Sequence, residues 1–363
     1  MLRAARSDNG SGSGMAAMQS TRRSSPLSGA GDATTAPLVR LRETHDVAYK
    51  AAGGARHTLD VYALDEDGSG GAEPLRPVVV FVHGGGWKWF SKRSRLLGIH
   101  QNVPRAFARR GFVAVAPNYR LSRFSPRFAA GLGAVIGAVL VAIVAASLPL
   151  QPVARYAGSL VAAFLAPVAV AVALLSRPCA REPTTHPAHA RDVADAVAWT
   201  VRNASKYGGD AERVILVGHS AGGHLIACLL TMPQLLLDAG VTDASSRIAA
   251  AISFSGVFDA HLLEHGSTAS GGACASVAAL FRRQWFLVPA FGRDRAAWAA
   301  AFPTHHTRTA ESVRALRLPP LLLVNAQSDA GLERHSQLWA GQLRAGGATV
   351  DEFVVPRADH LSY

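Results

Sequence analysis

Cysteine is scarce in this sequence, with only Cys179, Cys228 and Cys274 in a chain of 363 residues. An odd number at scattered positions builds no disulfide framework and favours a reducing compartment for the folded part. The cysteines show no metal-ligand spacing, and no zinc-finger, helix-turn-helix or RNA-binding signature accompanies the formal charge of +12. The sequence therefore predicts neither a disulfide scaffold nor a nucleic-acid-binding protein.

Acidic residues are absent from a long central stretch. Between Lys88 and Arg181 the sequence has thirteen lysines and arginines and no aspartate or glutamate, which accounts for the whole net charge. Two interpretations stay open. The charges either spread over a solvated surface of Ala- and Arg-biased composition, or they attract an anionic membrane face.

The N-terminal segment, residues 1–42, has few apolar residues and is rich in Ser, Gly, Ala and Thr. Such a composition cannot bury a core and predicts a disordered tail. Its arginines and serines also fit a transit segment, although Asp8 and Asp32 weaken that alternative, and it lacks the apolar stretch of a secretory signal. Residues 43–363 are long enough, and the chain at 49% hydrophobic is apolar enough, for one catalytic α/β domain.

Strand-like and helix-like patterns alternate along that domain, which predicts a largely parallel sheet covered by helices. The predicted strands are 57–64, 78–82, 111–117, 213–217, 248–255, 321–325 and 350–355, and the predicted helices are 95–110, 189–207 and 332–345.

Two uncharged apolar runs, Ala129–Leu150 and Ala157–Leu175, interrupt this alternation. Each is close to the ~20 residues that span a bilayer, and arginines flank the pair on both sides. We therefore expect a transmembrane hairpin at residues 129–175, with the catalytic domain cytosolic on an endomembrane such as the endoplasmic reticulum or Golgi. A pair of Ala-rich buried or lipid-surface helices is the alternative.

The strongest chemical signal is Gly218-His219-Ser220-Ala221-Gly222, which directly follows a predicted strand and leads into a helical stretch. This is the strand, sharp turn and helix of a nucleophile elbow, in which small residues flank a serine on a strained turn. The motif predicts that Ser220 is a catalytic nucleophile.

A second motif, His83-Gly84-Gly85-Gly86-Trp87, ends another predicted strand. Glycines here leave backbone N–H groups free to stabilise an oxyanion together with the N–H of the residue after the nucleophile. We expect Gly85, Gly86 and Ala221 to be the donors. A phosphate-binding loop does not fit, because the P-loop and dinucleotide spacings are missing.

Together these motifs resemble the α/β-hydrolase superfamily, in the branch that pairs an HGGG-type loop with a GHSAGG elbow. The branch includes hormone-sensitive-lipase-like and feruloyl-esterase-like proteins, kynurenine formamidases and isoprenylcysteine methylesterases. The resemblance covers about residues 57–363 apart from the apolar runs, and Asn118-Tyr119-Arg120 resembles the family's Tyr-Arg pair, which supports the oxyanion loop. It implies an α/β-hydrolase fold, with a mostly parallel central sheet and helices on both faces.

The resemblance also implies a catalytic triad in the order Ser, acid, His. Asp329, after the strand 321–325, matches the acid, and His360 matches the base. Asp359 and Asp259 are alternative acids, whereas His83, His219 and His224 are expected to be structural. The sequence ends three residues after His360, where the resembling proteins continue into a final helix.

These residues predict ester hydrolysis through an acyl-enzyme, without a metal or organic cofactor. The expected substrate is a small lipophilic ester, with a prenylcysteine methyl ester at a membrane as the leading specific candidate. An amidase or formamidase of the same fold, or a catalytically silent membrane-anchored binding protein, is the alternative. Residues 256–318 are expected to form a cap, whose aromatic side chains either line the substrate site or form the cap's own core: Phe258, Phe281, Trp285, Phe286, Phe291 and Trp298.

Overall fold

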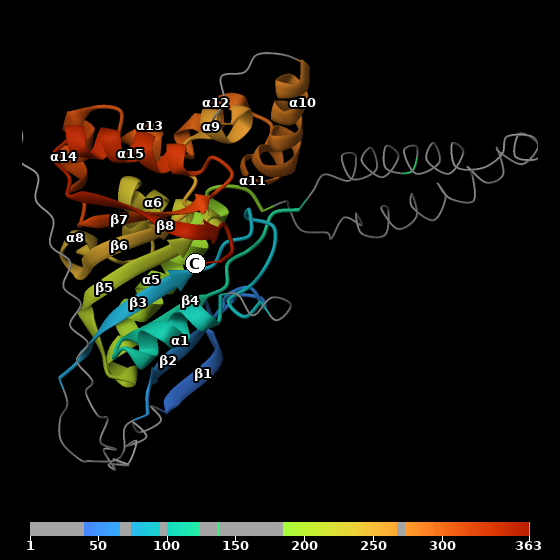
Figure 1. Cartoon of the computed structure of the whole chain (residues 1–363). Helices are drawn as coiled ribbons and strands as arrows, with labels where there is room; N and C mark the ends of the chain where they lie inside the picture. The colour runs from blue at the N-terminus through green and yellow to red at the C-terminus, as the bar shows by residue number, and fades with distance from the viewer. Residues whose placement is uncertain are drawn as a thin grey trace, which may run out of the picture. The chain divides into compact units, whose positions relative to one another are not determined.

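Within the part of the chain that the structure describes, the strands form one eight-stranded sheet (Figure 1). The computed structural model describes residues 40–65, 74–94, 100–123, 137, 184–266 and 273–362. The strand order is β1-β2-β4-β3-β5-β6-β7-β8, in which β1 and β2 are antiparallel and the strands from β4 to β8 run parallel. The strands are β1 (Leu41–Ala48), β2 (Thr58–Leu64), β3 (Arg76–Val82), β4 (Val113–Pro117), β5 (Gly209–His219), β6 (Ile248–Phe254), β7 (Leu321–Ser328) and β8 (Val350–Asp359).

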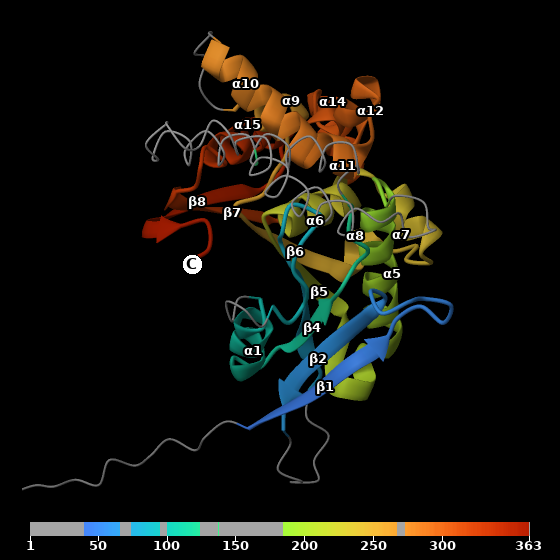
Figure 2. The same ribbon diagram turned by 90° about the vertical axis from the view of Figure 1, so that its right-hand side faces the viewer.

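Helices cover both faces of this sheet. Figure 2 shows α1 on one face and α5 on the other, and α6 and α15 pack on the α5 face. The main helices are α1 (Asn102–Arg109), α5 (Ala188–Asn203), α6 (Ala221–Thr231), α7 (Gln234–Asp238), α8 (Ala244–Arg247) and α15 (Glu333–Ala345), and a 3₁₀ turn (Ala204–Tyr207) extends α5. The predicted parallel sheet with helices on both faces is confirmed.

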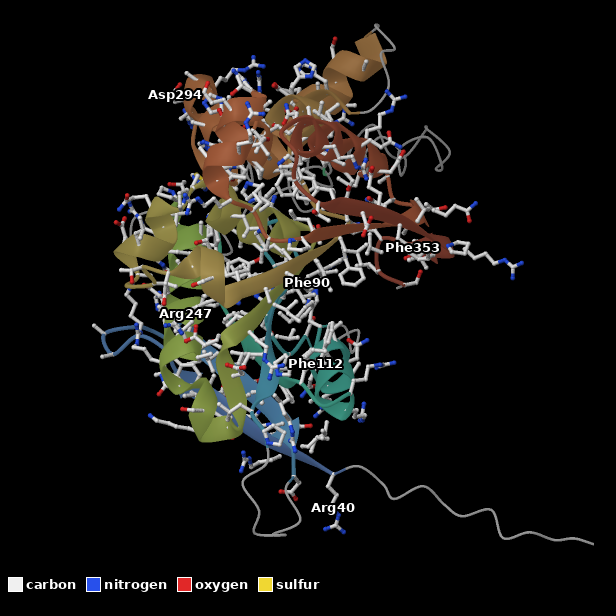
Figure 3. The ribbon with its side chains drawn as sticks, turned by 90° about the vertical axis from the view of Figure 1, so that its left-hand side faces the viewer. Arg40, Phe90, Phe112, Arg247, Asp294 and Phe353 are labelled. Atoms are coloured by element: carbon white, nitrogen blue, oxygen red, sulfur yellow. The ribbon has the colours of Figure 1, made fainter. Side chains whose placement is uncertain are left out.

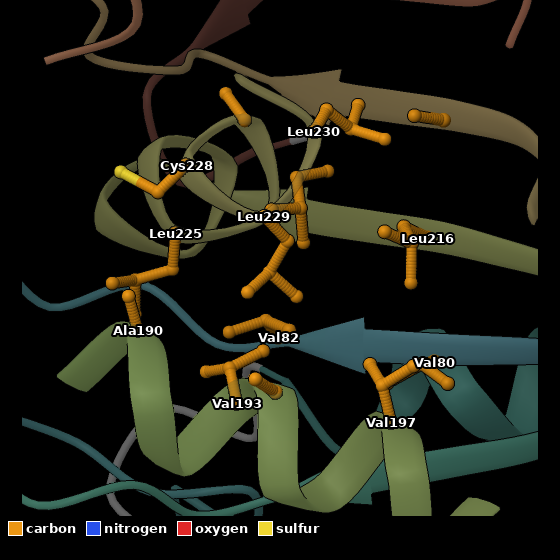
Figure 4. Close-up of a cluster of buried hydrophobic side chains, with 14 of the residues drawn as sticks. Val80, Val82, Ala190, Val193, Val197, Leu216, Leu225, Cys228, Leu229 and Leu230 are labelled. Atoms are coloured by element: carbon orange, nitrogen blue, oxygen red, sulfur yellow. The ribbon is translucent and has the colours of Figure 1, made fainter. Parts of the chain in front are cut away.

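The strand β3 shows why its sequence is a continuous apolar run. Val80 and Val82 pack against Val193 and Val197 of α5 in the larger core cluster (Figure 4). The alternate residues of β3 point to the opposite face and pack in a smaller cluster beside α1. A parallel strand buried on both faces needs apolar side chains at every position, and each fully buried valine contributes about 1.5 to 3 kcal/mol.

A group of helices lies between β6 and β7, at the top of Figure 1. They are α9 (Ala260–His265), α10 (Ala273–Arg282), the π-helix η2 (Arg283–Leu287), α11 (Val288–Phe291), α12 (Arg295–Ala300), α13 (Pro303–His306) and α14 (Ala310–Leu316). Phe258, Phe291 and Trp298 belong to the larger core cluster, whereas Phe281 is 47% exposed. The role of residues 256–318 as a cap stays a prediction.

The predicted transmembrane hairpin at residues 129–175 is wrong as a description of this structure. Among the described residues no helix is both long and apolar enough to cross a membrane. The longest of them, α5, has 16 residues, or about 24 Å against a hydrocarbon core of about 30 Å. The two apolar runs lie outside the described residues, apart from Gly137.

The membrane location deduced from that hairpin is corrected with it. The prediction of a multi-pass protein with a cytosolic catalytic domain rested on run length and on the absence of charge. Both runs are rich in alanine and glycine, whose small side chains gain little free energy from leaving water, so these criteria were insufficient. The predicted N-terminal tail also lies outside the described residues up to residue 39.

The last strand of the sheet exposes two adjacent apolar side chains. β8 is the last strand in the order, and its Phe353 and Val354 are 56% and 54% exposed. Figure 3 shows Phe353 on this strand. On the α1 face, a cavity of about 400 Å³ lies beside α1 and is bordered by His219 and Leu361. The rest of its lining is mainly apolar and includes Phe81, Val103, Phe107 and Phe254.

Candidate active site

Ser220 is the single residue between the end of β5 and the start of α6. Its φ of 53° and ψ of −118° lie in a region that side chains rarely adopt, and its backbone N–H donates to the carbonyl of Phe254 at 2.8 Å. This is the strained strand-to-helix turn of a nucleophile elbow. The local geometry predicted from the motif is therefore present.

The glycines around Ser220 are required by close approaches of backbone. A Cβ on Gly218 would lie 2.5 Å from the carbonyl of Gly222, and a Cβ on Gly222 would lie 2.1 Å from the carbonyl oxygen of Val82. A Cβ on Gly223 would lie 2.3 Å from the hydroxyl of Ser253. Any larger residue would push α6 away from the strands that it covers.

Asp329 and His360 leave neighbouring strands and meet. Ser328, at the end of β7, pairs with Asp359, at the end of β8, so the residues that follow emerge side by side. Nδ1 of His360 lies 2.8 Å from Oδ1 of Asp329. The carboxylate only accepts hydrogen bonds, so Nδ1 carries the proton and Nε2 has a free lone pair. The arrangement leaves His360 ready to accept a proton.

The buried carboxylate of Asp329 is held by further donors. Its Oδ2 accepts from Asn325 Nδ2 at 2.9 Å, from Ala326 N at 3.2 Å and from the hydroxyl of Ser255. Burial alone would raise the pKa of Asp329, but the hydrogen bonds that it accepts outweigh burial, and the pKa is lowered. Asn325 and Ser255 were not predicted, since nothing in the sequence shows that β6 and β7 bring them to this carboxylate.

His219 connects the base to the elbow. Its Nε2 lies 2.9 Å from the backbone carbonyl of His360, and the two imidazole centroids are 4.9 Å apart. Burial, followed by the nearby His360, lowers the pKa of His219 to about 3, so its ring is neutral. In the described residues Ser220 and His360 form no direct hydrogen bond, and such contacts often tighten only in the complex with substrate.

The glycine loop after β3 lies beside the nucleophile. A Cβ on Gly84 would lie 3.2 Å from Cβ of Ser220, so this backbone approaches the serine closely. Gly85 and Gly86 have φ of +113° and +54°, and a Cβ on Gly85 would lie 2.2 Å from the carbonyl oxygen of Trp89. Ala221, the residue after Ser220, begins α6. The close approach of Gly84 was not predicted.

The residues after β4 support this loop, as the Asn118-Tyr119-Arg120 resemblance implied. The hydroxyl of Tyr119 donates to the carbonyl of His83 at 3.0 Å, and the two rings stack with centroids 4.4 Å apart. Arg120 binds the buried Asp192 of α5 through two hydrogen bonds of 2.7 Å. These contacts fix the loop to the sheet and to α5.

Three aromatic side chains lie around Lys88, two residues after the glycine loop. The ammonium group of Lys88 lies 4.5 Å from the ring of Trp89, 5.2 Å from Trp285 and 4.7 Å from Phe286. The Phe286 ring is also 3.1 Å from where a Cβ on Gly86 would stand. The segment between β6 and β7 therefore brings apolar surface next to the glycine loop.

A parallel sheet with a serine on a strand-to-helix elbow, and an Asp–His pair at the next strand ends, defines a hydrolase-type α/β protein. Sequence comparison agrees: the α/β-hydrolase fold family matches residues 181–363, and a second family, BD-FAE, matches residues 59–140. The chain belongs to the α/β-hydrolase fold family.

Curated relatives share parts of the chain. Esterase LipQ of Mycobacterium tuberculosis is 27% identical over 48% of this chain and 39% of its own length. Probable isoprenylcysteine alpha-carbonyl methylesterase ICMEL1 of Oryza sativa subsp. japonica is 44% identical over 15% of this chain and 13% of its own length. The alignments thus cover less than half of either relative.

Among solved structures, esterase B of Lactobacillus rhamnosis superimposes with a TM-score of 0.55 at 18% identity. The superposition covers 87% of this chain and 75% of that one. At this identity the likeness concerns the fold.

Proposed function

We propose that this protein is a carboxylic ester hydrolase in which Ser220 is the nucleophile, His360 the general base and Asp329 its orienting acid. The observation that carries the proposal is the Asp329–His360 hydrogen bond, held by His219 next to the strained serine. The α/β-hydrolase family and the ester-hydrolase names of LipQ and ICMEL1 support it.

The reaction follows from this geometry. Nε2 of His360 accepts the proton of Ser220 as its oxygen attacks the ester carbonyl carbon. The N–H groups of Gly85, Gly86 and Ala221 stabilise the oxyanion of the tetrahedral intermediate. The intermediate collapses, the C–O bond breaks, and the alcohol leaves with the proton from the imidazole. A water molecule then attacks the acyl-enzyme carbonyl and gives a proton to His360. The bond to the Ser220 oxygen breaks, His360 returns the proton to that oxygen, and the carboxylic acid is released.

The substrate we propose is a lipophilic ester, with a prenylcysteine methyl ester as the specific candidate. The rings of Trp89, Trp285 and Phe286 beside the glycine loop offer apolar surface next to the reacting carbonyl. The methylesterase name of ICMEL1, a relative over a short stretch, points the same way. Amides remain chemically open to the same triad, because only the leaving group differs.

Labelling with a fluorophosphonate probe tests the nucleophile. The wild type and a Ser336→Ala control, which lacks a buried serine hydroxyl elsewhere, should be labelled, whereas Ser220→Ala should not. Asp329→Asn should fold normally but lose about 10³- to 10⁴-fold in kcat on a short p-nitrophenyl ester, because the wrong imidazole tautomer is favoured. Undiminished labelling of Ser220→Ala would show that Ser220 is not the nucleophile.

A substrate panel then tests the class of ester. p-Nitrophenyl esters of increasing acyl length, an S-farnesylcysteine methyl ester and the matching amides are compared by kcat/KM. The proposal expects ester turnover that rises with apolar length. Preference for the amides would identify an amidase, and a wild type that neither labels nor turns over any substrate would identify a binding protein.

A further inference from the structure

His224 lies one turn into α6, four residues after Ser220, and is fully buried. Its Nδ1 is 3.2 Å from Nε1 of Trp87, and its Nε2 is 3.0 Å from the carbonyl oxygen of Ala301. An indole N–H only donates, so Nδ1 must accept. The proton therefore sits on Nε2 and is donated to Ala301. Burial lowers the pKa of His224 well below its usual value, which keeps this single neutral tautomer.

The imidazole is enclosed by aromatic rings. The Trp87 ring meets it edge-on with centroids 5.1 Å apart, and Phe302 and Phe291 lie at 4.9 and 5.6 Å. The sulfur of Cys228, on the next turn of α6, is 3.4 Å from Nε2. A ring packed on all these sides cannot turn to form other hydrogen bonds.

Trp87 is the residue through which this contact reaches the glycine loop. It directly follows Gly86, is 1% exposed, and has a φ of 59°, which is unusual for a bulky residue. Its carbonyl accepts from the backbone N–H of Ser122 at 2.8 Å. The backbone N–H of His224 in turn donates to the carbonyl of Ser220 at 3.1 Å. One side chain thus joins the loop to the helical turn that begins at the nucleophile.

We propose that His224 is a positioning residue: by accepting from Trp87 and donating to Ala301 it fixes the Gly85–Gly86 loop relative to Ser220. It touches no reacting atom, and it also ties both elements to the segment between β6 and β7. The inference rests on the proposed ester hydrolysis and adds a residue that the triad and the oxyanion donors do not include.

Trp87→Phe tests the proposal, because it removes the indole N–H and leaves an aromatic ring in place. We expect kcat for a short ester to fall about 10- to 100-fold with KM nearly unchanged, as for a partly lost oxyanion donor. His224→Phe should behave similarly, and His224→Gln, whose amide can accept and donate, should recover much of the activity.

The matched control is Trp339→Phe, at a buried indole whose nitrogen makes no hydrogen bond within the described part of the chain. It should lose stability by packing alone and keep the kcat of the wild type. The decisive readout is the ratio of kcat/KM for an ester and its thionoester. Sulfur accepts hydrogen bonds poorly, so the wild type should strongly prefer the ester and Trp87→Phe should prefer it less.

Two failures are distinguishable. An active wild type whose ester preference is unchanged in Trp87→Phe and His224→Phe overturns the positioning role alone. A wild type that neither reacts with the fluorophosphonate nor hydrolyses an ester overturns the proposed function, and the inference falls with it. If His224→Phe does not fold, Trp87→Phe decides.

Discussion

At the scale of single residues, the backbone conformation that presents the Ser220 hydroxyl lowers the stability of the fold. Its positive φ costs on the order of 1 to 3 kcal/mol in a non-glycine residue. The surrounding contacts, including the hydrogen bond from its N–H to Phe254, hold the turn in place. The strain therefore belongs to the elbow whether or not the hydroxyl is present.

Replacing Ser220 separates these two effects. Ser220→Gly should be more stable than Ser220→Ala by about 1 kcal/mol, because glycine adopts a positive φ without a steric cost. Urea unfolding of the two inactive variants measures the difference. Equal stabilities would mean that the turn relaxes around alanine.

Lys88 provides a pH dependence at the same scale. Burial lowers the pKa of Lys88 from 10.5 to about 7. Between these values the unfolded chain binds the proton and the folded protein does not, so this residue makes stability rise with pH. Lys88→Met should abolish that part of the rise. We expect the free energy of unfolding of the wild type, minus that of the variant, to increase from about pH 7 to about pH 10. A constant difference would contradict it.

At the scale of elements, the parallel strands and the elbow were predictable for physical reasons. Strands buried on both faces read as apolar runs, so β3 and β4 were found near their true ends. The edge strand β1 was missed because its residues are exposed or half-buried and form no apolar run. The helix predicted at 95–110 is α1, Asn102–Arg109, and residues 95–99 lie outside the described chain.

The candidate site divides in the same way. The glycines next to Ser220 are visible in the sequence because a tight turn tolerates no Cβ. Asn325, Ser255 and the Trp87–His224 contact were not visible, because they depend on which elements lie side by side in the fold. The sequence pattern therefore predicts local backbone geometry. It does not predict which side chains from distant segments become neighbours, because that depends on how the helices pack on the sheet.

Two of the ion pairs that α5 makes with residues outside it offer an element-scale prediction. Asp192 is fully buried against Arg120, whereas Asp195 pairs with the exposed Lys50 at 2.6 Å. Arg120→Ala removes the arginine partner of a buried carboxylate, which keeps its contact with His57, and should cost about 3 kcal/mol. Lys50→Ala, the control, should cost less than about 1 kcal/mol. Denaturant unfolding measures both, and equal losses would show that burial does not decide the value of the pair.

At the scale of the whole molecule, the two ends of the sheet differ. At one end β1 exposes charged and polar residues, including Arg42, His45 and Asp46. At the other end β8 exposes the apolar Phe353 and Val354 next to the charged Asp351 and Glu352. β8 is last in the strand order, so its outer backbone edge has no neighbouring strand among the described residues. The molecule therefore has one edge strand with exposed polar residues and one on which two adjacent apolar side chains are also exposed.

This asymmetry has a practical consequence for handling the protein. Exposed apolar side chains on an edge strand can guide the addition of a strand from another chain, so samples should become turbid with time and concentration before the core melts. Introducing charge with Phe353→Lys and Val354→Lys should delay that turbidity, measured by light scattering below the unfolding temperature, whereas the same change at Leu338 of α15, which is also exposed, should not. If the wild type and the β8 variants become turbid after the same lag time, the surface responsible for aggregation lies elsewhere. On this view the shelf life of a concentrated sample is set by one strand and not by the stability of the fold.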